Sequence, residues 1–354
     1  MSYLMNAWYV AAWDEEVGPN ALLARTLLDQ PVVLFRDAQG HAHALADRCP
    51  HRFVPLSKGR LCADGQAIEC AYHGLRFAGS GQCVHNPHGD GKIPAAAQVR
   101  RYPLVERHSC LWIWMGPAEL ADPAAIPDFS CMDPAHWHVG KGYLRAQAHY
   151  QLETDNILDL SHIEFLHPGT LGSDAVKQAT TELRQDGHTV WSLRQTHDEV
   201  MPDFLYAAMA LPQGMRVDRW IDVRWTPPAN LLLDAGATPT GRPRHEGRQN
   251  WLPHLFTPET ATSTHYWFGI SFPKAMGPAG EQLARQQIAG LKVPFETEDL
   301  PMLELQQQAM GTNDFWAQRP VLLSGDAAAV RARRVLDQLI AQERATLAST
   351  ETLR

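Results

Sequence analysis

The chain has 354 residues, a length that predicts two domains. Hydrophobic residues make up 45% of it and charged residues 20%, enough for full cores, and the formal net charge of −8 offers no general cationic field to a nucleic acid. Its six cysteines are too sparse for a disulfide scaffold. The composition therefore excludes disordered, fibrous and disulfide-rich secreted proteins.

The N-terminal segment carries no sign of export or membrane insertion. It contains Trp8 and the acidic Asp14-Glu15-Glu16 in place of a basic and then apolar signal. No apolar run approaches the roughly 18 residues that a membrane span needs. We therefore expect a soluble, cytoplasmic protein with no membrane or nucleic-acid partner.

The first third of the chain predicts short strands separated by turns. Residues 31–35 and 41–45 flank the turn residues Asp37-Ala38-Gln39-Gly40 in a hairpin pattern, and residues 110–115 form an apolar strand. A stretch with several prolines follows, at Pro117, Pro123, Pro127 and Pro134. We expect an all-β domain over residues 1–118 and a linker after it.

Residues 119–354 predict an α+β domain. Three segments have helical composition, namely Glu153 to His167, Glu298 to Met310 and Asp326 to Leu347. Pro168-Gly169 is expected to end the first of them. Four segments have strand patterns, namely Thr189–Gln195, Trp220–Trp225, Asn230–Asp234 and His265–Phe272. The predicted architecture is an antiparallel sheet flanked by helices.

Two cysteine–histidine pairs lie in the first domain, as Cys49-Pro50-His51 and Cys70-Ala71-Tyr72-His73. Such ligands suit either a structural zinc ion or a [2Fe-2S] cluster in which two thiolates hold one iron and two imidazoles the other. Zinc fingers usually place both cysteines in one knuckle and both histidines on one helix. Here each loop supplies one of each, which favours the two-iron cluster.

These loops also carry a family resemblance. Residues 49–56 and 70–77 resemble the Rieske loops of the terminal components of aromatic-ring oxygenases, and most of all the vanillate and dicamba O-demethylase group. The similarity extends over nearly the whole chain, from Asn6 to Asp337. It implies a [2Fe-2S] cluster held by the two cysteines and two histidines.

A second pair of potential metal ligands, His162 and His167, stands five residues apart in a helical pattern. On an ideal helix they would be about 140° out of phase, so both reach one metal only if the helix is irregular or ends between them. Alone they could be ordinary helix-end histidines. A cluster that donates electrons needs an acceptor, however, and an iron bound by two histidines and a carboxylate would be one. The resemblance extends over Asn156 and Asp159, which we expect to be catalytic.

The third ligand must be a carboxylate from elsewhere, and residues 295–300 contain three acids. The resemblance places the family's acid in a Glu-Asp pair here and favours Asp299, with Glu298 as the alternative. Acids at a helix N-terminus are also favoured by the helix dipole, which accounts for Glu296 or Glu298.

Asp159 lies three residues before His162, so on a helix its carboxylate could accept the imidazole N–H. A solvated surface acid is the alternative. The resemblance implies a further role, in which this aspartate connects the iron site of one subunit to His73 of the next in a homotrimer.

Three polar residues are weaker candidates for substrate binding. His254 matches a pocket-lining position of dicamba demethylase-like sequences, and Asn230 and Asp234 belong to a nearby strand. Each could equally be an ordinary polar residue of the sheet.

The sequence has no Rossmann fingerprint, P-loop or flavin signature, so the chain cannot take hydride from NADH or NADPH itself. The resemblance implies a partner reductase with flavin and an iron–sulfur centre, and an oxygenase that uses O2 to hydroxylate or O-demethylate an aromatic substrate, most simply an aromatic acid. A ring hydroxylase or an N-demethylase of the same fold is an alternative. An electron carrier or a zinc-stabilised binding protein is the alternative of another class, which the second ligand set argues against.

Overall fold

The computed structural model describes residues 3–167, 171–173, 175 and 179–352. It divides into two compact units, one spanning Met5–Ile126 and the other running from Pro127 onward together with Tyr3 and Leu4. The division lies eight residues beyond the expected boundary at residue 118, within the proline-rich stretch. Among the helices in the described part of the chain, none is long and apolar enough to cross a membrane.

The first unit is built from three small antiparallel sheets, with the strand orders β1-β11-β10, β2-β3-β4-β9 and β5-β6-β7-β8. Its strands are β1 (Trp8–Trp13), β2 (Leu23–Leu27), β3 (Gln30–Arg36), β4 (Ala42–Ala46), β5 (Arg60–Leu61), β6 (Ala67–Glu69), β7 (Arg76–Ala78), β8 (Cys83–His85), β9 (Arg101–Tyr102), β10 (Leu104–Arg107) and β11 (Cys110–Trp114). The predicted hairpin is confirmed as β3 and β4, and the apolar strand as β11. The all-β fold therefore follows from the short strand patterns.

The second unit contains a seven-stranded antiparallel sheet with the order β12-β18-β17-β16-β15-β14-β13. Its strands are β12 (Trp137–Ala146), β13 (Thr180–Asp186), β14 (Thr189–Val200), β15 (Arg216–Thr226), β16 (Asn230–Pro239), β17 (Arg248–Thr260) and β18 (Ser263–Pro273). Four of them contain the predicted strand segments. The residues of β18 are buried from Ser263 to Phe272, as expected for an inner strand covered on both faces.

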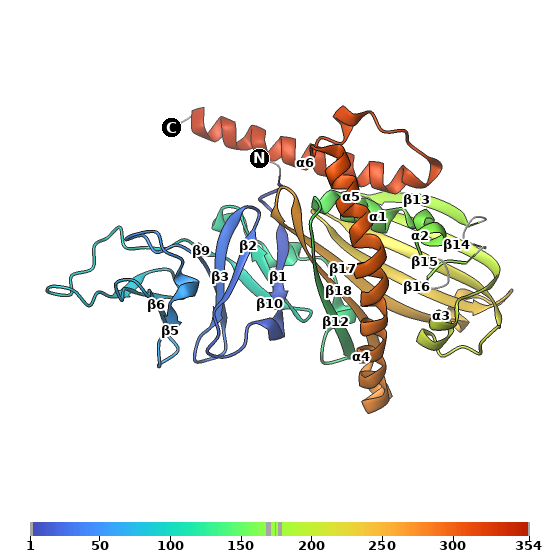
Figure 1. Cartoon of the computed structure of the whole chain (residues 1–354), viewed down its shortest axis with the longest axis horizontal. Helices are drawn as coiled ribbons and strands as arrows, with labels where there is room; N and C mark the ends of the chain where they lie inside the picture. Colours follow the sequence, from blue (N-terminus) through green and yellow to red (C-terminus); the bar gives the residue numbers. More distant parts are fainter. Residues whose placement is uncertain (1–2, 168–170, 174, 176–178, 353–354) are drawn as a thin grey trace. The chain divides into compact units, whose positions relative to one another are not determined.

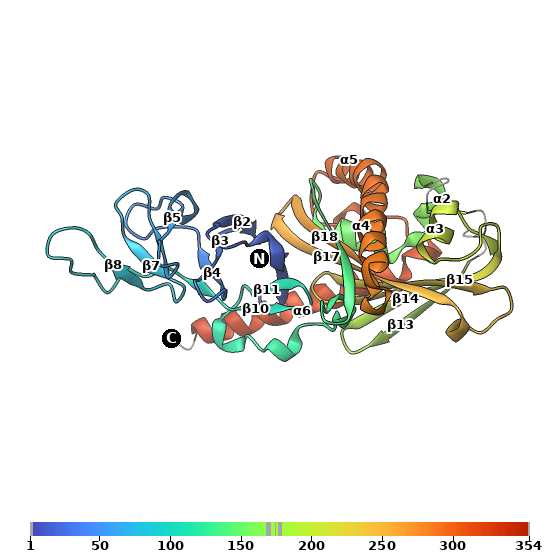
Figure 2. The same ribbon diagram turned by 90° about the horizontal axis from the view of Figure 1, so that it is seen from below.

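Helices cover this sheet, as predicted. They are α1 (Tyr150–Leu158), α2 (Ile163–Leu166), α3 (Asp203–Ala208), α4 (Gly277–Pro294), α5 (Leu300–Met310) and α6 (Ala327–Thr352). Figures 1 and 2 show α4 and α5 as one continuous column on a single side of the sheet. Gly140 in β12 allows this close approach, because a Cβ there would lie 2.4 Å from the main-chain oxygen of Ala284 in α4.

Two predicted helices differ from the observed ones. The segment Glu153 to His167 is not one helix: α1 ends at Leu158, a 3-10 turn follows at Leu160–His162, and α2 is a single turn. The expected stop at Pro168-Gly169 lies outside the described residues. The helix expected to start at Glu298 instead continues from α4 through a π-helical turn at Phe295–Asp299. Asp299 is therefore inside a helical column rather than at its start.

Candidate active site

The two cysteine–histidine loops of the first unit have the same backbone design. The main-chain oxygen of Cys49 accepts a hydrogen bond from the N–H of Phe53 (2.9 Å), and the main-chain oxygen of Cys70 accepts one from the N–H of Gly74 (3.0 Å). The φ angles of Phe53 and Gly74 are 63° and 71°, the left-handed region that closes each loop. Each loop therefore presents its cysteine and its histidine in a similar way.

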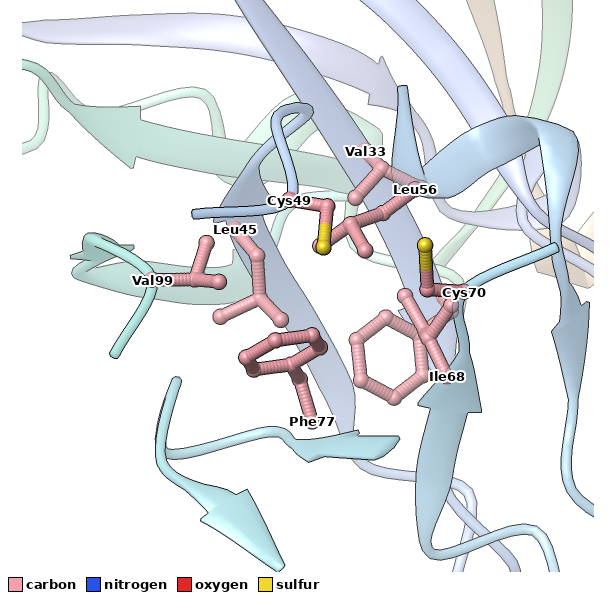
Figure 3. Packing of buried hydrophobic residues seen from close by; sticks show 9 residues of the cluster. Val33, Leu45, Cys49, Leu56, Ile68, Cys70, Phe77 and Val99 are labelled. Atoms are coloured by element: carbon pink, nitrogen blue, oxygen red, sulfur yellow. The ribbon is translucent and has the colours of Figure 1, made fainter. Parts of the chain in front are cut away.

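The cysteines and histidines of these loops lie in different environments. Cys49 and Cys70 are each 2% exposed, in a core cluster with Val33 and Ile68, and Figure 3 shows both thiol side chains in that cluster. Burial raises the pKa of the Cys49 thiol, and the adjacent Cys70 thiol acts in the same direction. His51 is exposed, and its ring centroid lies 4.4 Å from that of His73. The thiols thus point inward and the imidazoles toward solvent.

This arrangement fits a two-iron cluster better than one zinc ion. Four ligands of a single zinc, each bonded at 2.0 to 2.3 Å, would all lie within about 4.6 Å of one another. Among the described residues, the group of three or more possible ligands within 4.8 Å of one another is His162, His167 and Asp299. The cysteine–histidine residues do not form such a group, as expected when two thiolates and two imidazoles hold separate irons.

His162, His167 and Asp299 converge in the second unit because the helical segment is irregular. The Asp159 carboxylate accepts the N–H of Ser161 (3.0 Å) and caps the 3-10 turn that contains His162. The single turn of α2 then leads to His167. The helix is therefore interrupted, which is the condition under which two histidines five residues apart can reach one metal.

The three side chains face one another through their metal-binding atoms. The Nε2 atom of His162 lies 3.5 Å from Oδ1 of Asp299, and that of His167 lies 3.2 Å from the same oxygen. His162 Nδ1 lies 2.8 Å from the main-chain oxygen of Asp159, and His167 Nδ1 contacts the Glu298 carboxylate. Protonated Nδ1 atoms bonded outward leave both Nε2 lone pairs for a metal.

Glu298 and Asp299 therefore occupy different positions around His167. Asp299, 7% exposed, faces Nε2, whereas Glu298 faces Nδ1 on the far side of the ring. Burial lowers the pKa of His167, but the Asp299 and Glu298 carboxylates outweigh it and the net change is upward. Burial is also the largest influence on His162, whose pKa is lowered. The geometry favours Asp299 over Glu298 as the third ligand.

The two residues expected to be catalytic, Asn156 and Asp159, lie beside the triad of His162, His167 and Asp299. Asn156 donates a hydrogen bond from Nδ2 to Oδ1 of Asp299 (3.1 Å). The sequence predicts that the Asp159 carboxylate accepts the imidazole N–H of His162. The structure differs, because the backbone turn brings the main-chain oxygen of Asp159 to that ring instead. That carboxylate lies 3.6 Å from the guanidinium of Arg194.

A cavity opens beside the triad and holds about 780 Å³ of empty space, counting its mouth. His254 lines it, is 2% exposed, and makes a 2.6 Å contact from Nδ1 to the Tyr266 hydroxyl. Burial lowers the pKa of His254 to about 3, so the ring is neutral. A neutral imidazole can donate or accept a hydrogen bond inside this cavity.

The structure does not bring Asn230 and Asp234 to this cavity. Strand residues alternate between faces, and the cavity takes Leu233 and Ala235 from the opposite face of β16. Asp234 instead accepts hydrogen bonds from Trp220 and Arg244. Sequence reasoning missed three polar lining residues, namely Arg219, Asn250 and Gln287. Asn250 could have been found from its even spacing with His254 on one strand.

Comparisons with known proteins match both units. Residues 7–103 match the Rieske [2Fe-2S] domain, and residues 146–342 match the vanillate O-demethylase oxygenase C-terminal domain. The oxygenase component of dicamba O-demethylase from Stenotrophomonas maltophilia is 39% identical over 96% of this chain and 98% of its own length. The iron-sulfur subunit of the toluene-4-sulfonate monooxygenase system from Comamonas testosteroni is 37% identical over 96% and 98%. A crystal structure of dicamba monooxygenase bound to 3,6-dichlorosalicylic acid covers 98% of this chain and 100% of its own, with 36% identity and a TM-score of 0.88.

The fold and these matches define the class of the protein, which is a Rieske non-haem iron oxygenase. Within that class the chain belongs to the vanillate O-demethylase oxygenase family. Several relatives are named as oxygenase components or subunits, some of them of multi-component systems. The chain is an enzyme rather than a non-catalytic electron carrier or zinc-stabilised module.

Proposed function

We propose that this oxygenase oxidises an aromatic acid at a methoxy or methyl carbon, at an iron held by His162, His167 and Asp299. The observation that carries the proposal is the convergence of these three side chains, with ligand atoms within 4.8 Å of one another, beside a cavity with a mainly apolar lining. Two imidazoles and one carboxylate leave positions open on non-haem iron, which supplies O2 activation when bound. Relatives named for dicamba, toluene-4-sulfonate and vanillate support an aromatic substrate.

The chain's own residues orient this site and keep it dry. Glu298 and the Asp159 main chain fix both imidazole rings, and Asn156 fixes Asp299. Leu233, Leu252 and similar side chains exclude water from the ring of the substrate. Hydroxylation of a methoxy carbon gives a hemiacetal that loses formaldehyde. O2, two electrons and two protons then yield the phenol, formaldehyde and one water.

Electron supply completes the proposal. Cys49, Cys70, His51 and His73 would hold the [2Fe-2S] cluster, which would supply single-electron transfer from a partner reductase that carries flavin and an iron–sulfur centre and oxidises NADH or NADPH. The two imidazoles at the surface support this route, because they offer a short path from the cluster to a partner. Following the family resemblance, we place Asp159 between the iron site of one subunit and His73 of the next in a homotrimer.

Turnover and metal content test the proposal together. The purified chain should contain two cluster irons and one further iron, and with a reductase and NADH it should release formaldehyde and a phenol from a methoxybenzoate in equal amounts. Ring-hydroxylated or N-demethylated products from matched substrates would show that the enzyme is a Rieske oxygenase that catalyses one of those reactions instead. Stoichiometric zinc in place of iron, or no product from any aromatic by a fully iron-loaded protein, would refute the proposal.

The subunit arrangement has its own test. Asp159→Asn should keep all irons and the trimer but lose most turnover, measured beside light-scattering mass. Near-normal turnover, or an active monomer at dilute concentration, would leave Asp159 as the cap of its 3-10 turn only.

A further inference from the structure

One face of the sheet forms the floor of the cavity, and its residues lie in cross-strand rows. Residues directly paired on antiparallel strands point to the same face. From one end of the floor to the other, the rows contain His254, then Leu233 with Leu252, then Ala235 with Asn250, and then Arg219. The floor is therefore apolar in the middle and polar at both ends.

The iron ligands are near the His254 end of this floor. The Phe295 ring centroid lies 5.7 Å from that of His254, and Phe295 begins the π-helical turn that ends at Asp299. Six residues along β15 separate the Arg219 row from the His254 row, a distance of about 20 Å at 3.3 Å per residue. The guanidinium of Arg219 is nearer to the iron ligands than this spacing, because its Nη1 lies 3.5 Å from the main-chain oxygen of Leu171 and the next residue, Gly172, donates its N–H to the main-chain oxygen of His167. A charged group held by it would be on the side of the substrate away from Asp299.

Arg219 is a buried cation with an unused donor. It is 5% exposed, and its Nη1 donates to Glu199 at 3.1 Å. The Glu199 carboxylate is also bonded to the hydroxyls of Ser173 (2.6 Å) and Thr196, which fixes it. The Nε of Arg219 has no hydrogen-bond partner among the residues that the structure describes. This Nε is buried, and a second oxyanion that enters beside it would satisfy one of the five N–H donors of the guanidinium.

We propose that Arg219 is a specificity residue that binds the anionic group of the substrate, a carboxylate or a sulfonate, across the ring from the carbon that is oxidised. Leu233 and Leu252 then contact the ring between the two ends. The inference rests on the proposed function and deepens it, because it selects para-substituted aromatic acids. Glu199 is a positioning residue that orients the guanidinium.

The experiment measures binding to the iron-loaded protein by equilibrium dialysis, without reductase. The probes are 4-methylbenzoate, toluene-4-sulfonate, the neutral 4-methylbenzamide and the isomer 2-methylbenzoate. Arg219→Met should weaken binding of the two para anions at least tenfold and leave the amide unchanged. Arg219→Lys, which keeps the charge, should recover part of the loss. The control is Arg216→Met, because Arg216 is on the same strand but exposed and paired with Asp198.

The outcomes separate the alternatives. A loss shared equally by anions and amide would make Arg219 structural, and an equal loss for the 2- and 4-isomers would overturn its placement across the ring. The double variant Arg219→Met/Glu199→Gln removes both buried charges and should show the same selective loss if the single variant folds poorly. Relative affinity for the benzoate and the sulfonate identifies the oxyanion. Failure of the proposed function would appear separately, as no NADH-dependent product from any aromatic, with the binding selectivity intact.

Discussion

The cluster loops and the iron triad obtain their ligands in different ways. Each cluster loop is a local design, in which a cysteine and its histidine are two or three residues apart and a left-handed residue closes the loop. The triad instead joins two histidines from an interrupted helix to a carboxylate more than a hundred residues later, in the π-helical turn between α4 and α5. Local hydrogen bonds shape the first site, whereas packing of the helical column on the sheet sets the second.

This difference teaches where each site is vulnerable. The cysteines are embedded in the core of the first unit, so the cluster and the fold of that unit depend on each other. The triad lies at the edge of a cavity, and its rings are held by hydrogen bonds to Asp159 and Glu298. Losing a ligand there should remove the metal and leave the sheet intact.

The largest expected effect is at the cluster. Cys49→Ser or Cys70→Ser should abolish the cluster, leave the first unit poorly folded and eliminate turnover, because thiolate binding contributes folding energy. The measurements are the visible cluster spectrum and a thermal melt. Cys62→Ser is the matched control, since Cys62 is only partly buried and outside the cluster loops, and should be mild. Equal damage from all three changes would contradict the ligand assignment.

The triad should show the opposite combination. Asp299→Ala should remove the single iron and reduce turnover by at least about a hundredfold, yet keep the cluster spectrum and the melting temperature close to wild type. Iron analysis and the spectrum are recorded on the same sample. Loss of the cluster colour would mean that the two sites are not independent. An unchanged iron content would mean that a residue other than Asp299 is the third ligand.

The local site was the more predictable one. The cysteine–histidine loops could be recognised from ligand type, spacing and the family resemblance, because the residues that shape them are nearby in sequence. The strand patterns of Trp220–Trp225 and Asn230–Asp234 likewise predicted β15 and β16 correctly. By contrast, α4 was not predicted, so Asp299 was interpreted as lying near a helix start. The cavity face of β16 depends on sheet register, which is why Asn230 and Asp234 were chosen and Arg219 was overlooked.

A smaller effect is expected at Glu298. Glu298→Gln keeps the size of the side chain but weakens the bond to Nδ1 of His167, so iron affinity should fall by about 10 to 100-fold, as for other outer partners of metal-bound histidines. Titration with Fe(II) measures it. If Glu298 were itself the third ligand, its loss would match that of Asp299→Ala, and Asp299→Asn would be the weaker change.

The smallest effect separates the two cluster loops from each other. Gly74 and Phe53 occupy the same left-handed position, and only Gly74 does so without a steric penalty. Gly74→Ala should lower the free energy of unfolding by about 1 to 2 kcal/mol, because the added Cβ is strained at this φ and lies 3.1 Å from Pro87 Cγ.

Phe53→Gly relieves the strain of a side chain at a left-handed position but loses the contact of the ring with Arg48, 4.2 Å away, and makes the unfolded chain more flexible. Its net change should stay within about 1 kcal/mol, since the opposing contributions are each of that order. Urea unfolding of the cluster-loaded protein compares the two, and a larger loss for Phe53→Gly than for Gly74→Ala would show that the exposed ring, rather than the backbone angle, stabilises the first loop.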